Sequence, residues 1–320
     1  MSNLIAFINL VRIKNLLIIL LIQIVIKFYL INTYSNNSAL SNIEFSIYLF
    51  ALISIIAGGY IINDLYDIEI DKINKPEIRI VEKKISKNNA IYIYYILNLL
   101  GITSGFYTAY QIKKLSFGLI FCFLAFSLWQ YSKNYKKSFF IGNLQVAFLT
   151  SLSIINLALF DLIPIDFANK HVNKIILYII FIYAGFSFIT TLIREIIKDL
   201  EDMNGDREIG AKTMAITYGK KKTKKIINFL IAVTILAIAY FQYFQYSILS
   251  SEFNVELSYW GANMSSVLYT FFLQMLLISL FIKINRAKIK SDFHNASTLC
   301  KTIMLIGILS IPFFHFLHQN

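Results

Sequence analysis

Aspartates recur at one spacing in two separate parts of the chain. In each part, three aspartates stand at positions i, i+3 and i+7, and the two sets are Asp64, Asp67 and Asp71, and Asp199, Asp202 and Asp206. Because an α-helix turns by about 100° per residue, this spacing places the three carboxylates within about 60° of arc. Each set therefore predicts a patch of carboxylates on one face of a helix.

The composition of the two sets indicates which ion they could bind. Three adjacent carboxylates repel one another and raise each other's pKa unless a cation keeps them ionised. Neither set contains His or Cys, which disfavours zinc, whereas Mg²⁺ is bound by a few carboxylates together with substrate phosphates. For one set alone, a solvated helix at a membrane edge would be an equal alternative. Two sets of identical spacing favour a Mg²⁺ and phosphate site.

Long apolar segments must position these aspartates, because each set begins where such a segment ends. The 320 residues are 57% hydrophobic and 15% charged, whereas soluble domains carry about 25% charged residues. Windows of about 19 residues predict an all-α polytopic membrane protein with nine transmembrane helices, over residues 13–34, 43–64, 89–110, 114–131, 141–160, 174–196, 223–246, 264–284 and 301–318. We expect residues 1–320 to form a single membrane domain with an internal repeat, marked by the motifs at 63–71 and 199–206.

The basic residues predict how these helices are oriented. Most of the 30 Lys and Arg residues lie near the amino terminus or in alternate loops, namely those after the second, fourth, sixth and eighth helices. The positive-inside rule places these segments, with both acidic motifs, in the cytoplasm. We expect a multi-pass protein of the cytoplasmic membrane, with the lipid bilayer as a partner. Because the net charge of +12 is spread over loops, we expect no nucleic-acid partner.

The two acidic motifs resemble those of UbiA-type intramembrane prenyltransferases. The stretch NDLYDIEID at 63–71 matches the family pattern NDxxDxxxD, and DLEDMNGD at 199–206 matches DxxDxxxD. Three shorter stretches are similar to the family as well: Asn74-Lys75-Pro76, Lys212-Thr213 and Tyr218-Gly219. The resemblance extends from Arg12 to at least Gly219 and depends on two ordered motifs at matching helix ends.

The resemblance implies nine helices around a central cavity that is capped by the two acidic loops. It also implies prenyl transfer, in which a prenyl diphosphate loses pyrophosphate and an acceptor attacks the resulting allylic carbocation. Mg²⁺ would stabilise the leaving diphosphate, and a dry cavity would protect the carbocation from water. The implied catalytic residues are the six aspartates and Tyr131, and the implied metal ligands are Asp64, Asp67, Asp199 and Asp202.

Other polar residues are candidates for substrate binding. Lys136 follows the fourth helix in a stretch similar to the tyrosine and basic pair of the family. Arg194 and Lys198 lie about one turn apart at the end of an apolar helix, where an arginine is costly unless paired. For Asn15 and Asn143, an interhelical hydrogen bond is an equal alternative to substrate binding. The expected substrate-binding set is Asn15, Asn63, Lys136, Asn143, Arg194 and Lys198.

The motifs indicate a prenyl diphosphate as one substrate, but they leave more than one acceptor possible. The stretches 194–199 and 204–206 are most similar to the branch that geranylgeranylates glycerol-phosphate ethers, so geranylgeranylglyceryl phosphate is the preferred acceptor. However, Glu77-Ile78-Arg79 stands where Asp-Arg-Pro is usual, which displaces Arg79 by one position. An aromatic quinone precursor of the 4-hydroxybenzoate or dihydroxynaphthoate type is therefore an alternative. A secondary transporter is a further one, although transporter sites lie near the bilayer midplane in broken helices.

Overall fold

Nine apolar segments form helices long enough to cross a bilayer within the part of the chain that the structure describes. The computed structural model describes residues 3–35, 37–74, 79–165, 170–208, 210–244 and 263–319. The nine spans are Ile13–Tyr34, Asn42–Tyr66, Lys87–Gln111, Leu115–Tyr135, Ile141–Asp161, Val172–Glu208, Met214–Tyr243, Met264–Arg286 and Lys290–Gln319. Each span overlaps one predicted helix, so the prediction of an all-α fold with nine membrane helices is confirmed.

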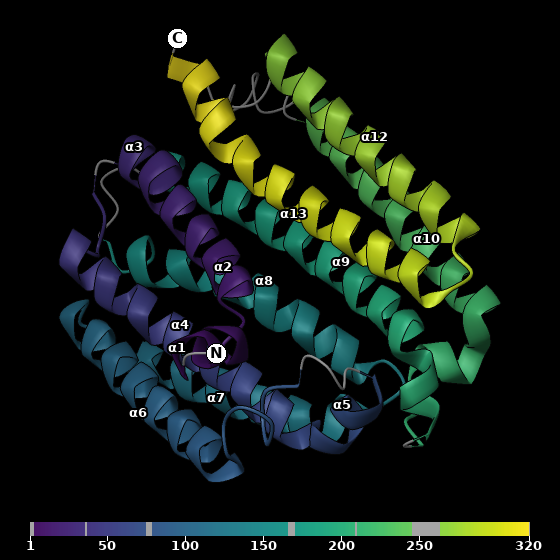
Figure 1. The fold of residues 1–320 in the computed structure, drawn as a ribbon. Helices are drawn as coiled ribbons and strands as arrows, with labels where there is room; N and C mark the ends of the chain where they lie inside the picture. Colours follow the sequence, from purple (N-terminus) through teal and green to yellow (C-terminus); the bar gives the residue numbers. More distant parts are fainter. Residues whose placement is uncertain are drawn as a thin grey trace.

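Short helical elements join or extend these spans (Figure 1). In chain order the elements are α1 (Asn3–Leu10), α2 (Ile13–Ile26), η1 (Lys27–Ile31), α3 (Asn32–Tyr34), α4 (Asn42–Tyr66), α5 (Ile68–Asn74), α6 (Lys87–Gln111), η2 (Leu115–Gly118), α7 (Leu119–Gln130), η3 (Tyr131–Tyr135), α8 (Ile141–Asp161), α9 (Lys170–Glu208), α10 (Met214–Phe244), α12 (Met264–Arg286) and α13 (Lys290–Gln319). Both η1 and η3 are short π-helical turns. Such turns occur often at functional sites.

Two helices extend beyond the apolar segments that predicted them. α9 continues to Glu208 through the second acidic motif, and α13 begins at Lys290, eleven positions before the predicted start. Polar contacts join these two extensions. His294 Nδ1 lies 2.9 Å from Glu201 Oε1, and Lys290 Nζ lies 3.9 Å from Asp202 Oδ1. A hydropathy window ends a helix where charges begin, so it could not predict these turns.

The exposed surface of the outer helices is apolar. In the most apolar stretch of α4, 61% of the residues are buried, compared with 17% in both α6 and α10. Several large side chains on these two outer helices are at least 65% exposed, among them Tyr92, Leu99, Phe229 and Leu236. Such a surface would be costly in water, whereas lipid accommodates it. The chain is a multi-pass membrane protein.

The helices pack around two main apolar cores. One core joins α2, α4, α7, α8 and the first half of α9, and the other joins the second half of α9 with α10, α12 and α13. In Figure 1, α10 and α12 lie on one side of the long α9 and α13, and α4, α6 and α7 lie on the other side. The long α9 therefore connects both cores, and its packing against α8 and α13 holds the halves together.

A buried ion pair lies at the end of the bundle opposite the acidic motifs. Lys27 Nζ is 2.7 Å from Asp161 Oδ2, and both side chains have no exposed surface. The same ammonium donates to the carbonyl oxygen of Leu40 at 2.7 Å, and the Leu40 N–H donates to Asp161 Oδ1 at 2.9 Å. This network connects the π-helical end of α2, the end of α8 and the segment before α4.

Removing one member of this pair should destabilise the protein strongly. We expect Lys27→Met to lower the free energy of unfolding by about 3–5 kcal/mol, because it leaves an uncompensated buried carboxylate. The double variant Lys27→Met/Asp161→Leu should recover most of that loss. Denaturant unfolding in mixed micelles measures both, with the exposed Lys283→Met as the control. Equal stability of Lys27→Met and Lys283→Met would contradict the role of the pair.

Candidate active site

A cavity of about 290 Å³ lies between α2, α4, α7, α8, α9 and α13, at the end of the bundle that carries both acidic motifs. Its inner wall is largely apolar and includes Leu52, Ile56, Leu124, Leu128 and Leu149. Charged side chains line the part nearest the helix ends. Twelve of the thirteen predicted site residues line it: Asn15, Asn63, Asp67, Asp71, Tyr131, Lys136, Asn143, Arg194, Lys198, Asp199, Asp202 and Asp206.

Asp64 is the predicted site residue that the structure places outside the cavity lining. The helix is interrupted at Asp67, where α4 ends with φ −95° and ψ 4°, and α5 begins at the next residue. The carboxylate of Asp64 instead lies 2.6 Å from Arg12 Nη2. The expectation that the first aspartate set shares one unbroken helical face is therefore wrong. Asp67 and Asp71 face the cavity, and Asp64 pairs with the start of α2.

The second aspartate set lies as its spacing predicted. α9 runs without a break through Asp199, Asp202 and Asp206, and all three line the cavity. Asn143, in the first turn of α8, donates from Nδ2 to Asp199 Oδ2 at 2.8 Å. The asparagine was expected either to bind substrate or to make an interhelical hydrogen bond. Here it bonds to the acidic motif across the interface between α8 and α9.

Basic side chains of the cavity pair with its carboxylates. Asp67 receives a hydrogen bond from Asn63 Nδ2 at 2.8 Å and an ion pair from Lys136. On α9, the carboxylate of Glu195 pairs with Arg194 at 2.6 Å and with Lys198 at 3.6 Å. The predicted phosphate-binding cations therefore all reach the cavity, and in this structure they contact its carboxylates.

The π-helical turn η3 positions Lys136 at the cavity. Tyr131 opens this turn and Lys136 ends it, and both line the cavity. The turn packs closely on the start of α8, since a Cβ added at Gly142 would lie 2.5 Å from the carbonyl oxygen of Tyr135 and 3.2 Å from Lys136 Cα. Glycine at position 142 therefore permits the close approach of two backbone segments, which fixes the course of the chain at Lys136.

Four charged cavity residues, Arg12, Lys137, Glu195 and Lys301, were not assigned from the sequence as binding residues. Arg12 precedes α2, pairs with Asp64 and lies over the ring of Tyr60, 5.0 Å from its centroid. Glu195 bridges Arg194 and Lys198, and Lys301 on α13 donates to Asn15 Oδ1 at 3.1 Å. Lys137 follows directly after Lys136, and all four residues line the cavity. The sequence signal for these residues is an ionisable group beside or within an apolar helix.

Other basic residues near the motifs do not line the cavity. Arg79, displaced in sequence from the family position, pairs with Glu82 at 3.8 Å. Lys133 lies over the ring of Trp129, 4.7 Å from its centroid. The segment 75–78, which includes the expected Lys75 and Pro76 and the departure at Glu77 and Ile78, lies outside the described residues.

The donor set of the cavity fits Mg²⁺ better than a softer metal. Five aspartates line the cavity, and no Cys or His of the described part of the chain does. Among the described residues, no three His, Cys, Asp or Glu side chains converge into a complete metal site. Mg²⁺ characteristically takes one or two carboxylates and completes its shell with water and substrate phosphates. Asp67 and Asp71 on one side, and Asp199, Asp202 and Asp206 on the other, could each contribute such ligands.

The sequence matches the UbiA prenyltransferase family over residues 24–299. The chain belongs to this family. A digeranylgeranylglyceryl phosphate synthase from Saccharolobus solfataricus is 39% identical over 183 residues, which cover 57% of this chain and 59% of that relative. The match thus spans less than two thirds of the relative's length.

Solved structures share the UbiA fold with this chain. One of them is the structure of a digeranylgeranylglyceryl phosphate synthase in membranes. It has a TM-score of 0.64 and 25% identity, and the superposition covers 98% of this chain and 99% of that chain. Another solved structure is that of a UbiA homolog from Archaeoglobus fulgidus bound to GPP and Mg²⁺. It has a TM-score of 0.58 at 14% identity, and the superposition covers 96% of this chain and 99% of that chain. The resemblance inferred from the acidic motifs is therefore confirmed.

Adding one methyl group beside Lys136 should disturb this UbiA-type cavity. We expect Gly142→Ala to lower stability by about 1–3 kcal/mol, because the new Cβ clashes with backbone that cannot move away freely. Gly185→Ala on α9 is the matched control, since a Cβ there meets nothing within 4 Å. Thermal unfolding in detergent compares them. An unchanged midpoint for Gly142→Ala would show that the contact between η3 and α8 is not tight.

Proposed function

We propose that the chain is a Mg²⁺-dependent prenyltransferase that moves an isoprenyl group from a prenyl diphosphate to a lipid acceptor. One observation carries the proposal: two acidic motifs, separated by four membrane spans, line one cavity whose inner wall is apolar. A diphosphate needs the charged end, and its hydrocarbon chain needs the apolar wall. The largely apolar wall would also exclude water from a reactive carbocation.

In this proposal, the carboxylates Asp67, Asp71, Asp199, Asp202 and Asp206 would hold Mg²⁺. When bound, Mg²⁺ neutralises the negative charge that develops on the departing diphosphate. Asp64 stays in the proposed metal set because it lies one turn before Asp67, although here it pairs with Arg12.

The basic residues would bind the diphosphate oxygens. Lys136 contacts Asp67, and Arg194 and Lys198 contact Glu195, so each is already oriented at the charged end of the cavity. A guanidinium can bind a phosphate through two parallel hydrogen bonds, and an ammonium acts as a point charge. Asn63 and Asn143 hold Asp67 and Asp199 by hydrogen bonds. These asparagines would orient the metal ligands.

The transfer itself exchanges one C–O bond for another. The bond from the allylic carbon to the diphosphate breaks, and its electrons leave with pyrophosphate. The hydroxyl oxygen of the acceptor forms an ether bond to that carbon and releases its proton. Tyr131 lines the cavity beside the charged residues. Its ring presents an electron-rich face that would stabilise the intervening carbocation.

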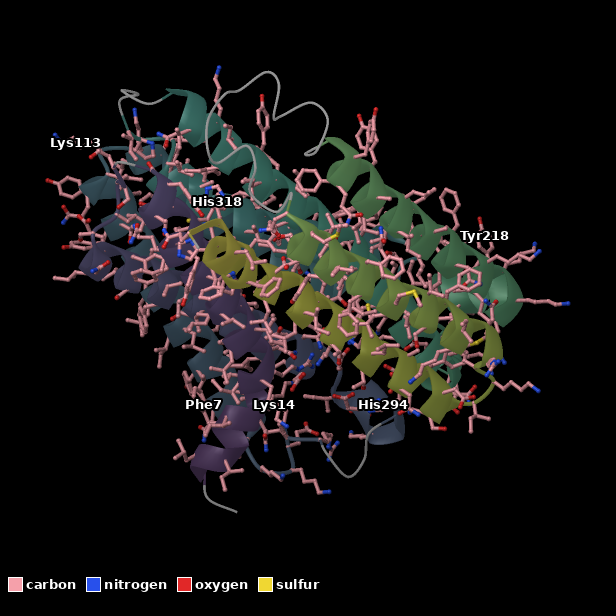
Figure 2. All side chains as sticks on the ribbon, turned by 90° about the horizontal axis from the view of Figure 1, so that it is seen from above. Phe7, Lys14, Lys113, Tyr218, His294 and His318 are labelled. Carbon is pink, nitrogen blue, oxygen red and sulfur yellow. The ribbon has the colours of Figure 1, made fainter. Side chains whose placement is uncertain are left out.

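We propose geranylgeranylglyceryl phosphate as the acceptor. The name shared by the curated relative and the first solved structure supports this choice, as does the stretch at 194–199. The orientation is part of the proposal: the acidic motifs face the cytoplasm across the cytoplasmic membrane. Figure 2 shows Lys14 and His294 in one region of the molecule and Lys113 in another. This separation agrees with the expectation that the amino terminus and the loop after the eighth helix lie on one side of the membrane, and the loop after the third helix on the other.

An assay with alternative acceptors tests the proposed reaction. Purified protein is incubated with labelled geranylgeranyl diphosphate, Mg²⁺ and either geranylgeranylglyceryl phosphate or an aromatic acid such as 4-hydroxybenzoate. We expect an ether product with the first acceptor, and none after EDTA treatment until Mg²⁺ is restored. Product with the aromatic acid alone would overturn the acceptor assignment. Activity that persists fully in EDTA would overturn the metal assignment.

Substitutions within the acidic motifs test the residue roles. We expect Asp67→Ala, Asp199→Ala and Asp202→Ala each to lower kcat by about a hundredfold or more, because charge stabilisation at the leaving group is lost. Glu69→Ala is the matched control, since Glu69 belongs to the first motif but its side chain is 76% exposed and pairs with Lys72. Normal turnover by any of the three aspartate variants at saturating Mg²⁺ would remove that residue from the site.

A further inference from the structure

A cation on the last helix lines the cavity and contacts the first turn of α2. Lys301 on α13 lines the cavity, and its ammonium donates to Asn15 Oδ1 at 3.1 Å. Asn15 lies in the first turn of α2, three residues after Arg12, which also lines the cavity. Lys301 and Asn15, from two helices that are distant in sequence, therefore meet in the cavity, and Arg12 lines the same cavity.

The contacts of Lys301 differ from those of the other assigned cations. Lys136 pairs with Asp67, and Arg194 and Lys198 pair with Glu195. The Lys301 ammonium makes no ion pair among the described residues, and its hydrogen-bond acceptor is a neutral amide. An ammonium within an apolar span is costly without a carboxylate partner, so a lysine in this position marks a functional site.

We propose that Lys301, with Asn15 and Arg12, binds the phosphate of the acceptor. This inference rests on the proposed function and names the part of the site that recognises the acceptor headgroup. The ammonium and guanidinium supply positive charge, and the Asn15 Nδ2 group supplies a neutral donor while its oxygen accepts from Lys301. The aspartates on α4, α5 and α9 attract Mg²⁺ and the diphosphate. Lys301, which pairs with no carboxylate among the described residues, supplies positive charge for a second anion in the same cavity.

Comparing two acceptors that differ only in the phosphate tests the assignment. The acceptors are geranylgeranylglyceryl phosphate and the corresponding alcohol, geranylgeranylglycerol, each with labelled geranylgeranyl diphosphate. The variants are Lys301→Gln, which removes the charge, and Lys301→Arg, which keeps it. Lys283→Gln on the exposed face of α12 is the control, and thermal unfolding in detergent checks that each variant is folded.

We expect Lys301→Gln to lower kcat/KM about tenfold to a hundredfold for the phosphorylated acceptor, which is the range for a lost hydrogen bond to a charged group. For the alcohol, kcat/KM should change less than about twofold, as should the KM for the diphosphate. Lys301→Arg should retain most of the preference for the phosphorylated acceptor. Equal losses with both acceptors, or a drop in kcat alone, would overturn the proposal and indicate a structural or proton-transfer role.

A binding measurement separates this inference from the proposed reaction. Calorimetric titration of the phosphorylated lipid and of the alcohol into protein without diphosphate requires no turnover. If the wild-type protein binds the phosphorylated lipid more tightly, loses that preference in Lys301→Gln and yet forms no ether, the proposed reaction fails while the phosphate site is supported. If the wild-type protein binds both lipids equally, the phosphate site is overturned whatever the assay of transfer gives.

Discussion

Charge balance inside an apolar bundle is the constraint on which the site depends. Six carboxylates and six basic side chains line the same cavity, where the low dielectric makes any unpaired charge costly. The pairs of Lys136 with Asp67 and of Glu195 with Arg194 and Lys198 meet this constraint in the protein alone. The same groups would separate when Mg²⁺ takes the carboxylates and a diphosphate takes the cations. The ion pairs therefore hold the carboxylates and the basic side chains in place in the protein without ligands.

The fold brings these charges together by placing helix ends at one end of the bundle. The long α9 carries the second acidic motif beyond the apolar core on rigid helix, and α13 supports that extension through His294 and Lys290. The first motif is different, because the break at Asp67 divides it between α4 and α5. One carboxylate set thus comes from an uninterrupted helix, and the other comes from a helix end and the short α5. At the opposite end, the buried pair of Lys27 and Asp161 closes the network that joins α2 to α8.

Much of this architecture could be predicted from the sequence, because a bilayer imposes a length and a composition on each span. All nine spans follow from hydropathy, and the aspartate spacing on α9 correctly predicts three carboxylates on one side. Three features could not be predicted. The break at Asp67 and the early start of α13 depend on local and tertiary contacts, which hydropathy does not contain. The meeting of Lys301 with Asn15 joins the two ends of the chain, and no spacing rule covers it. The internal repeat stays a prediction.

The central claim is that both acidic motifs hold one metal–diphosphate group at the mouth of the apolar cavity. The most direct test is a crystal or cryo-EM structure with Mn²⁺ and an unreactive thio-analogue of geranylgeranyl diphosphate, with the metal located by anomalous scattering. The account predicts metal density bordered by Asp67 and Asp71 on one side and by Asp199 and Asp202 on the other, with the diphosphate between them and the prenyl chain against Leu124 and Leu149. Metal bound to one motif alone, or a diphosphate outside this cavity, would contradict it.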